Sequence, residues 1–296
     1  MTVSPHAAAG ARRAVVLGHT GFVGRALHTY LVGQGVDVRG YGSAGLDLRH
    51  ADALAALDGV LNPETVLVVC AAITPDRGQT IDQFAENVAM AVNLGRWLKG
   101  HPAGKLVYVS TDAVYPMTDG AISEATPVRP EGFYPLAKHV VEQALGQVAA
   151  EAKLPLLILR PVSMFGPGDT HNSYGPNRFV RQVVAERSVR LFGEGDDERD
   201  HLYVEDAARL IGTLALGDVT GTLNLATGVS RSFGSIVEQL QAIAPYPFQV
   251  VRQPRSGPAS FRPFDIGQLA AAIPGLTFTD FQTALRTTFN AAQGAG

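Results

Sequence analysis

Short apolar segments alternate with longer amphipathic segments over the first half of the chain. β-branched and aliphatic residues fill five runs typical of buried parallel strands, at residues 14–17, 36–41, 66–70, 106–110 and 156–159. Helical periodicity fills the stretches at residues 22–32, 51–57, 81–99 and 135–151. Such alternation builds right-handed βαβ units, so the sequence predicts a doubly wound α/β sheet. Ligands of such sheets bind at the carboxyl ends of the strands.

The pattern changes after Arg160. Gly, Pro, Asn and Asp crowd residues 165–177, which indicates a long loop. Beyond it we expect a helix at 178–187, strands at 189–192 and 201–204 around an acidic turn, a helix at 206–216 and a strand at 222–225. The stretch 230–290 predicts two or three helices and one strand, at 248–252.

These patterns predict two structural units. The larger is a Rossmann-type parallel sheet formed by residues 13–164 together with about 203–228. The smaller is a discontinuous C-terminal substrate lobe formed by residues 165–202 and 229–296. Residues 1–12 are expected to form a flexible tail.

Composition excludes several functional classes. Lys and Arg number 24 against 27 Asp and Glu, a net charge of −3, so we expect no nucleic-acid partner. A single cysteine, Cys70, excludes an intrachain disulfide framework, and the eight scattered histidines predict no metal site. No apolar run reaches membrane-spanning length and no signal peptide is recognisable, so we expect no membrane partner and a cytoplasmic location.

A glycine-rich loop follows the first predicted strand and opens a helix. Gly18, Gly21 and Gly24 allow a close backbone approach, and a helix N-terminus offers N–H donors to a dinucleotide pyrophosphate. The second strand ends in Gly42 and Ser43 rather than in the acid that reads a ribose 2′-hydroxyl. The cofactor is therefore NAD or NADP, and the sequence does not choose between them.

A tyrosine and a lysine share one face at the start of a predicted helix. Tyr134 and Lys138 are four residues apart, and a nearby ammonium favours the phenolate form of a tyrosine. Such a phenol is a workable acid and base for interconverting a hydroxyl and a carbonyl. Thr111 ends the preceding strand, where its hydroxyl would hold the substrate oxygen.

Together these residues resemble the extended short-chain dehydrogenase/reductases, specifically the NAD-dependent epimerase/dehydratase family that acts on nucleotide sugars. The resemblance runs from Val15 to about Phe289 and includes Ser-Thr-Asp-Ala-Val-Tyr at 110–115 and Arg-Asp-His-Leu-Tyr-Val-Glu-Asp at 199–206. It implies Thr111, Tyr134 and Lys138 as the catalytic set. It implies cofactor contacts at Gly18, Thr20, Gly21, Phe22, Val23, Gly24, Ser43, Asp47, Leu48, Ala71, Ala72, Asn87, Ser110, Tyr134, Lys138 and Pro161. It implies substrate contacts at Thr111, Ser163, Asn177, Arg178, Phe179, Phe192, Arg199 and Arg255.

The chain departs from the family pattern at two positions. Ser163 stands where the family usually has Asn, which puts one substrate contact in doubt. Ala113 stands where the 4,6-dehydratases carry a glutamic acid, so elimination of water would lack its proton donor. The compact stretch 42–48 and Ser-Thr-Asp at 110–112 are similar to the 4-keto-6-deoxysugar reductases of the same superfamily.

Three functions follow from these observations. The first is a nucleotide-sugar epimerase, at C4: Tyr134 takes the hydroxyl proton, the nicotinamide takes hydride, and hydride returns to the other face of the keto sugar. The second is a net reductase of a keto sugar, or a sugar or sugar-acid dehydrogenase. The third is a catalytically silent dinucleotide-binding regulator, which would have no use for Lys138 or Tyr134. The family resemblance also implies a homodimer through a four-helix bundle formed by 81–99 and 135–151.

Overall fold

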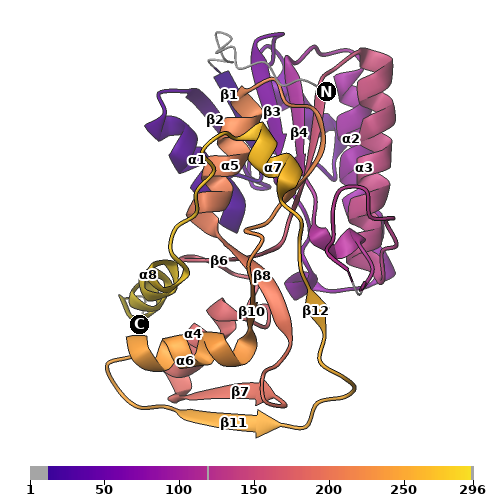
Figure 1. The fold of residues 1–296 in the computed structure, drawn as a ribbon. Helices are drawn as coiled ribbons and strands as arrows, with labels where there is room; N and C mark the ends of the chain where they lie inside the picture. The colour runs from indigo at the N-terminus through magenta and orange to yellow at the C-terminus, as the bar shows by residue number, and fades with distance from the viewer. Residues whose placement is uncertain (1–12, 119, 295–296) are drawn as a thin grey trace.

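Six parallel strands form the central sheet of the computed structural model, which describes residues 13–118 and 120–294 (Figure 1). The predicted tail at 1–12 lies outside the described residues. The strand order is β2-β1-β3-β4-β5-β9. In chain order the strands are β1 (Arg13–Leu17), β2 (Asp37–Tyr41), β3 (Thr65–Val69), β4 (Lys105–Val109), β5 (Leu156–Pro161) and β9 (Gly221–Leu225).

Helices cover both faces of this sheet, as Figure 1 shows. On one face α1 (Phe22–Gly33) packs beside α5 (Val204–Leu216), and on the other α2 (Ile81–Leu98) packs beside α3 (Phe133–Ala152). Alternate residues of each strand enter opposite cores: Val16 faces α1 and α5, whereas Val15 faces α2 and α3. The prediction of a doubly wound Rossmann-type sheet is confirmed.

The strand order reverses beside β1, which pairs with β2 on one side and with β3 on the other. This arrangement is the topological switch point at which such sheets bind ligands. The crossover from β2 to β3 holds the 3₁₀ helix η1 (Ala51–Leu57). The helix predicted at 51–57 is present, and it is a 3₁₀ helix. The segment has only seven residues to bury Leu54 and Leu57, and the tighter turns accomplish this within the short crossover.

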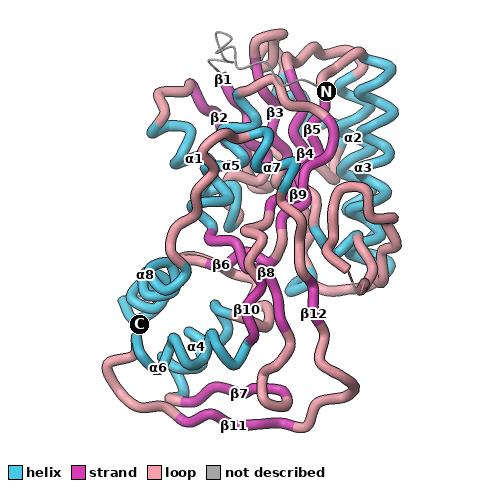
Figure 2. The backbone as a smooth tube through the Cα atoms, viewed as in Figure 1, coloured by secondary structure: helices cyan, strands magenta, loops and turns pink. Residues whose placement is uncertain are grey.

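A second group of elements lies below the sheet and is called the lower lobe here. It holds α4 (Pro176–Glu186), α6 (Phe233–Ile243), α8 (Phe281–Gly294) and the parallel pair of β7 (Ser188–Phe192) with β11 (Gln249–Gln253). Figure 2 shows the remaining strands between this group and the sheet. They are β6 (Ser163–Phe165), β8 (Glu198–Tyr203), β10 (Ser230–Ser232) and β12 (Phe261–Arg262).

The lower lobe departs from the sequence pattern at its short strands. The stretch 230–290 was expected to hold one strand, but β10 and β12 also form there because each pairs with β8. Strands of two or three residues depend on their pairing partner and leave no periodic signal. The short helix α7 (Gly267–Ala272) returns to the sheet and buries Leu269 beside β9. No helix within the described residues is long and apolar enough to cross a bilayer.

Candidate functional site

A cavity of about 360 Å³ opens at the carboxyl ends of β1, β3, β4 and β5. Its lining includes the glycine loop, the end of β3 at Cys70, the turn after β4 at Thr111 and the first turns of α3 at Tyr134 and Lys138. Residues of the long loop after β6 complete the wall nearest the lower lobe. The chain thus brings the cofactor loop and the three predicted catalytic side chains to one space.

The glycine loop has the shape that a dinucleotide requires. Gly18 has a φ of +84°, and a Cβ placed on it would lie 2.7 Å from the amide nitrogen of Ala71. A Cβ on Gly24 would overlap the carbonyl oxygen of Gly18. Gly21 is the N-cap of α1 and makes no side-chain cap, so the first-turn N–H groups can serve a bound phosphate. The loop, the helix N-terminus and the adjoining cavity therefore fit a nicotinamide dinucleotide.

Lys138 is fixed at the floor of the cavity. Its ammonium donates to the carbonyl oxygen of Val109 at 2.6 Å and lies 4.4 Å from the ring centroid of Tyr108. Burial lowers the pKa of this ammonium to about 8. Thr111 caps the 3₁₀ helix η3 (Asp112–Val114), where its hydroxyl accepts the N–H of Ala113 at 3.2 Å.

Tyr134 is protonated at neutral pH in this structure. Burial raises the pKa of its phenol, and the carboxylates of Asp112 and Asp76 raise it further. Lys138 is not among the groups that shift this pKa in the free chain, so the effect expected of its ammonium stays a prediction for the chain with its cofactor bound. The free chain therefore presents an acid, not a phenolate, to the cavity.

Most of the predicted cofactor residues meet at the cavity. It is lined by Gly18, Gly21, Phe22, Val23, Gly24, Ala72, Ser110, Tyr134, Lys138 and Pro161. Thr20 lies beside the end of β2, because a Cβ on Gly42 would be 2.8 Å from its hydroxyl oxygen. Ser43 is exposed just beyond that strand. Leu48, Ala71 and Asn87 line a separate space of about 20 Å³.

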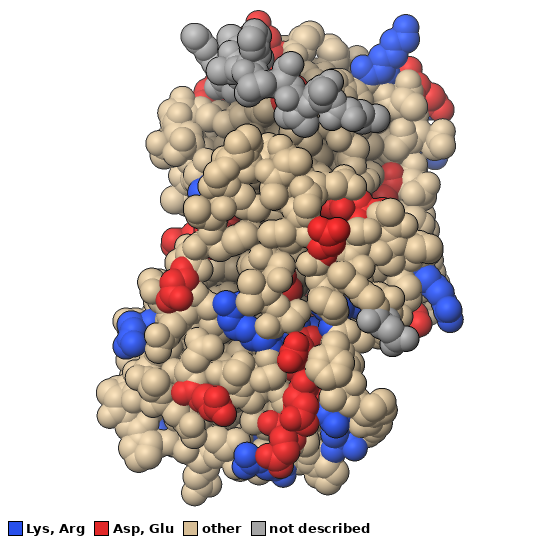
Figure 3. Space-filling view, in the orientation of Figure 1, with Lys and Arg blue, Asp and Glu red and all other residues tan. Residues whose placement is uncertain are grey.

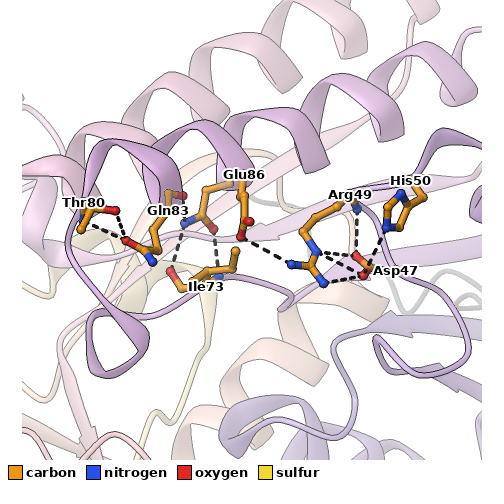
Figure 4. A network of polar contacts seen from close by, with 8 residues as sticks. Asp47, Arg49, His50, Ile73, Thr80, Gln83 and Glu86 are labelled. Atoms are coloured by element: carbon orange, nitrogen blue, oxygen red, sulfur yellow. Dashed lines mark hydrogen bonds and ion pairs between the residues drawn. The ribbon is translucent and has the colours of Figure 1, made fainter.

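Two predicted cofactor residues are engaged by other residues of the chain, and Figure 4 shows Asp47 among its neighbours. The amide of Asn87 bonds both the N–H and the carbonyl of Ile73, which fixes the loop after β3. The carboxylate of Asp47 accepts the guanidinium of Arg49 at 2.7 Å, and this hydrogen bond lowers the pKa of Asp47 to about 2. Arg49 also lies 3.6 Å from Glu86.

The predicted substrate residues divide into three groups. Thr111, Ser163 and Asn177 line the cavity, although the Asn177 amide already bonds the backbone of Gly166. Phe179 is 0% exposed in the core of the lower lobe, so its ring cannot touch a ligand. That assignment is wrong for the side chain, because α4 turns its apolar face inward.

The third group lies in the lower lobe and outside the cavity lining. It comprises Arg178, Phe192, Arg199 and Arg255. Arg199 donates to Ser260, and Arg255 lies 3.6 Å from both Asp196 and Asp197. Acidic and basic side chains lie side by side over this lobe in Figure 3. Arg199 is therefore engaged by hydrogen bonds in the free chain, whereas Arg255 is held near these two carboxylates only by loose ion pairs.

Sequence reasoning missed two contacts to the turn that carries Thr111. Arg262 of β12 donates to the Asp112 carbonyl at 2.5 Å, and its Nε lies 3.2 Å from the Asp112 carboxylate. The hydroxyl of Ser110 donates to Glu142 at 2.5 Å. No pattern marks Arg262, but Glu142 has a signal: it continues the four-residue spacing of Tyr134 and Lys138 along α3. Within the described residues, no group of His, Cys, Asp and Glu has the arrangement of a metal site.

Fold and site together define a Rossmann-type enzyme with a nicotinamide dinucleotide cradle and a Thr–Tyr–Lys set. The model of the NAD dependent epimerase/dehydratase family matches residues 14–226. The chain belongs to this family, and the prediction made from its motifs is confirmed.

Known proteins with similar sequence or structure agree with this family. The uncharacterized UDP-glucose epimerase YtcB of Bacillus subtilis is 26% identical over 67% of this chain, and the match spans 63% of that relative, less than two thirds of its length. RMD from Pseudomonas aeruginosa complexed with NADPH has a TM-score of 0.86 at 21% identity, covering 96% of this chain and 99% of that one. The UDP-glucose 4-epimerase of Thermus thermophilus in complex with NAD has a TM-score of 0.83 at 22% identity, covering 96% and 100%.

Proposed function

We propose that the protein is an NAD(P)-dependent nucleotide-sugar epimerase that inverts a hydroxyl-bearing carbon, C4, through a keto sugar. The observation that carries the proposal is the shared cavity of Thr111, Tyr134 and Lys138 with the glycine loop. The UDP-glucose 4-epimerases among the similar proteins support the choice of sugar position. The Gly18–Gly24 cradle would hold the dinucleotide, which when bound supplies the hydride acceptor and donor.

The chain's own residues would then handle the proton. Tyr134 would exchange it with the substrate oxygen, and the hydroxyl of Thr111 would hold that oxygen in line. Lys138 would fix the cofactor ribose with its ammonium, whose pKa of about 8 leaves it mostly charged at neutral pH. A positively charged nicotinamide beside Tyr134 would oppose the effect of burial and of Asp112 on the phenol.

A net reductase of a keto sugar is the second candidate. The raised pKa of Tyr134 favours it, because reduction needs a proton donor at the carbonyl oxygen. The compact stretch at 42–48 forms the first part of the crossover between β2 and β3, and η1 follows it. A regulator without catalysis is disfavoured by the cavity that Tyr134 and Lys138 line.

One panel separates these candidates. The purified chain is incubated with UDP-, dTDP- and GDP-sugars, once with NAD and once with NADP, and products are identified by NMR. Epimerisation gives a new sugar with no net change in absorbance at 340 nm. Conversion with stoichiometric change in reduced nicotinamide identifies the reductase, and failure to convert any sugar in the panel contradicts the epimerase proposal.

A homodimer through α2 and α3 also belongs to the proposal. Ile81 is 56% exposed, and Phe133 and Leu136 are also exposed large apolar residues on these helices. Four helices, two from each copy, would cover them. Light scattering at micromolar concentration tests the dimer, and a monomer mass would contradict it. A cytoplasmic location stays a prediction of the sequence.

A further inference from the structure

A buried ion pair lies directly behind the side of the cavity that carries Thr111, Tyr134 and Lys138, which is called the catalytic wall here. Glu142 of α3 is 1% exposed and Arg160 of β5 is 6% exposed. The guanidinium donates to both carboxylate oxygens, with Nη2 to Oε2 at 2.6 Å and Nε to Oε1 at 3.0 Å. This two-point geometry fixes the relative rotation of helix and strand more tightly than one contact would.

The pair reaches both sides of the Thr111 turn. Ser110, the residue before Thr111, donates its hydroxyl to Glu142 at 2.5 Å. Tyr115 is the C-cap residue of η3. Its hydroxyl oxygen accepts a hydrogen bond from Nη1 of Arg160 at 2.8 Å, and its ring centroid lies 4.9 Å from the guanidinium carbon. Ser110 was expected to contact the cofactor, but its hydroxyl is engaged by Glu142.

The network continues into the edge of the sheet. The Tyr115 hydroxyl donates to the side-chain oxygen of Asn224 on β9, at 2.9 Å, and Asn224 pairs with Arg160 in the strand register. One hydrogen-bonded network therefore joins α3, which carries Tyr134 and Lys138, to the turn that carries Thr111. It does so through groups that water does not reach.

A gain in folding stability alone would not explain why this ion pair is buried here. Two buried charges lose solvation that their attraction repays only partly, and an apolar replacement is often as stable. In some proteins such a pair specifies a geometry instead of adding stability. Burial alone would raise the pKa of Glu142, but the hydrogen bonds of Arg160 and Ser110 hold it below its usual value, so the carboxylate is charged.

We propose that the Glu142–Arg160 pair is a positioning device, which aligns Thr111 with Tyr134 and Lys138 and keeps a negative charge one turn from the Lys138 ammonium. The inference rests on the proposed function and names the residues that set up its catalytic wall. Neither Glu142 nor Arg160 needs to touch the substrate. Arg160 and Glu142 act through Ser110, Tyr115 and Lys138.

The charge of Glu142 affects the pKa of Lys138, which an uncharged side chain of the same size would not do. Burial lowers the pKa of Lys138, whereas Cys70 at the end of β3 and Glu142 on α3 oppose that effect. The Tyr108 ring and the Val109 carbonyl also face the ammonium, Tyr134 lies one turn away on α3, and His139 faces Glu142 at 3.3 Å. Removing the Glu142 charge should let Lys138 lose its proton at lower pH.

The test measures binding of NADH and NADPH by nucleotide fluorescence between pH 6 and 9.5, which needs no substrate. The wild-type affinity should fall as pH passes about 8, where Lys138 loses its proton. In Glu142→Gln the midpoint should move to lower pH by about half a unit to one unit, with about 1.5-fold to threefold weaker binding at pH 7.5. Glu186→Gln, which breaks an exposed ion pair on α4, is the control and should keep the wild-type midpoint.

A double variant keeps the test valid where Glu142→Gln does not fold. Glu142→Leu with Arg160→Met removes both charges, so it should regain melting temperature relative to Glu142→Gln and still show the shifted midpoint. A lower melting temperature with an unmoved midpoint in either variant overturns the inference and leaves a purely structural pair. A wild-type chain that binds neither nucleotide instead overturns the proposed function, and this inference with it.

Discussion

Charged side chains under the sheet and in the lower lobe are arranged in contrasting ways. Behind the catalytic wall, Glu142 and Arg160 are paired in a space closed to water, and Lys138 is fixed beside them. In the lower lobe, Arg252 pairs with Glu194 while 55% and 67% of their side chains remain exposed. The buried groups have one arrangement, whereas the exposed ones can exchange partners at little cost.

This contrast separates the two halves of the proposed site. Thr111, Tyr134 and Lys138 line one cavity in the ligand-free chain, and catalysis would need them to be held in a fixed geometry. Arg255 is held by acidic neighbours that a phosphate can replace. We therefore expect changes at Thr111 and Tyr134 to affect the rate of reaction, and changes in the lower lobe to affect the affinity for the nucleotide sugar.

The largest effect is expected at the catalytic wall. Tyr134→Phe removes the phenol that exchanges the proton, so kcat should fall by about 10² to 10⁴. The ring volume is kept, and cofactor affinity from fluorescence titration should change little. Turnover close to the wild-type rate would show that another group handles the proton. Single-turnover rates and NADH titrations on the same preparation check both halves of this expectation.

The next effect concerns stability and tests the contrast in burial directly. Glu142→Ala leaves Arg160 charged and buried, so the free energy of unfolding should fall by about 3–5 kcal/mol. Glu194→Ala breaks the exposed pair with Arg252 and should cost less than about 1 kcal/mol. Urea unfolding followed by circular dichroism measures both. Equal losses in the two variants would remove the distinction between the regions.

The sheet could be predicted from the sequence because its strands carry their own signal. Residues 66–70 and 106–110 are apolar runs that both faces of a parallel sheet require, and they became β3 and β4. The order of the glycine loop, Thr111 and Tyr134 then placed these groups at one edge, since all strands run the same way. The parallel arrangement of the strands therefore predicted both the sheet and the edge at which the site lies.

The lower lobe could not be predicted to the same depth. Strand β12 has only two residues, and it forms through its pairing with β8. Arg262 on it reaches Asp112 across 150 positions of sequence, so no local pattern connects them. Phe179 was assigned to the substrate by its place in a motif, but the apolar face of α4 takes its ring into the core. Contacts between segments that are far apart in the sequence depend on tertiary packing, which hydrophobic periodicity does not predict.

A smaller effect is expected at the loop after β6 that lines the cavity. Burial alone would raise the pKa of Asp169, but hydrogen bonds from His171 lower it to about 2. A depressed pKa gives stability above the unfolded value of about 3.9, and this stability is lost as pH falls through about 2. Asp169→Asn should therefore cost about 2 kcal/mol near pH 5 and progressively less below pH 4.

The partner of Asp169 sets the upper limit of that window. The hydrogen bond to Asp169 raises the pKa of His171, so its contribution is complete below about pH 6.5 and is lost as pH rises through the folded value. Melting temperatures of the wild type and Asp169→Asn, recorded from pH 3 to pH 9, should differ most between pH 4 and 6.5. Parallel curves over the whole range would show that the two groups do not titrate together.

The smallest effect is expected at the binding side of the site. Arg255 donates to the Gly257 carbonyl at 3.1 Å and pairs loosely with Asp196 and Asp197, so its guanidinium is available to a diphosphate. Arg255→Gln should raise KM for the nucleotide sugar about tenfold and leave kcat unchanged, because the lost contact is equal in ground and transition states. Arg252→Gln, at the exposed pair with Glu194, is the matched control and should change neither constant. A fall in kcat without a change in KM would place Arg255 at the reacting carbon. It would then contradict the division between a rigid catalytic wall and an adjustable substrate-binding side in the lower lobe.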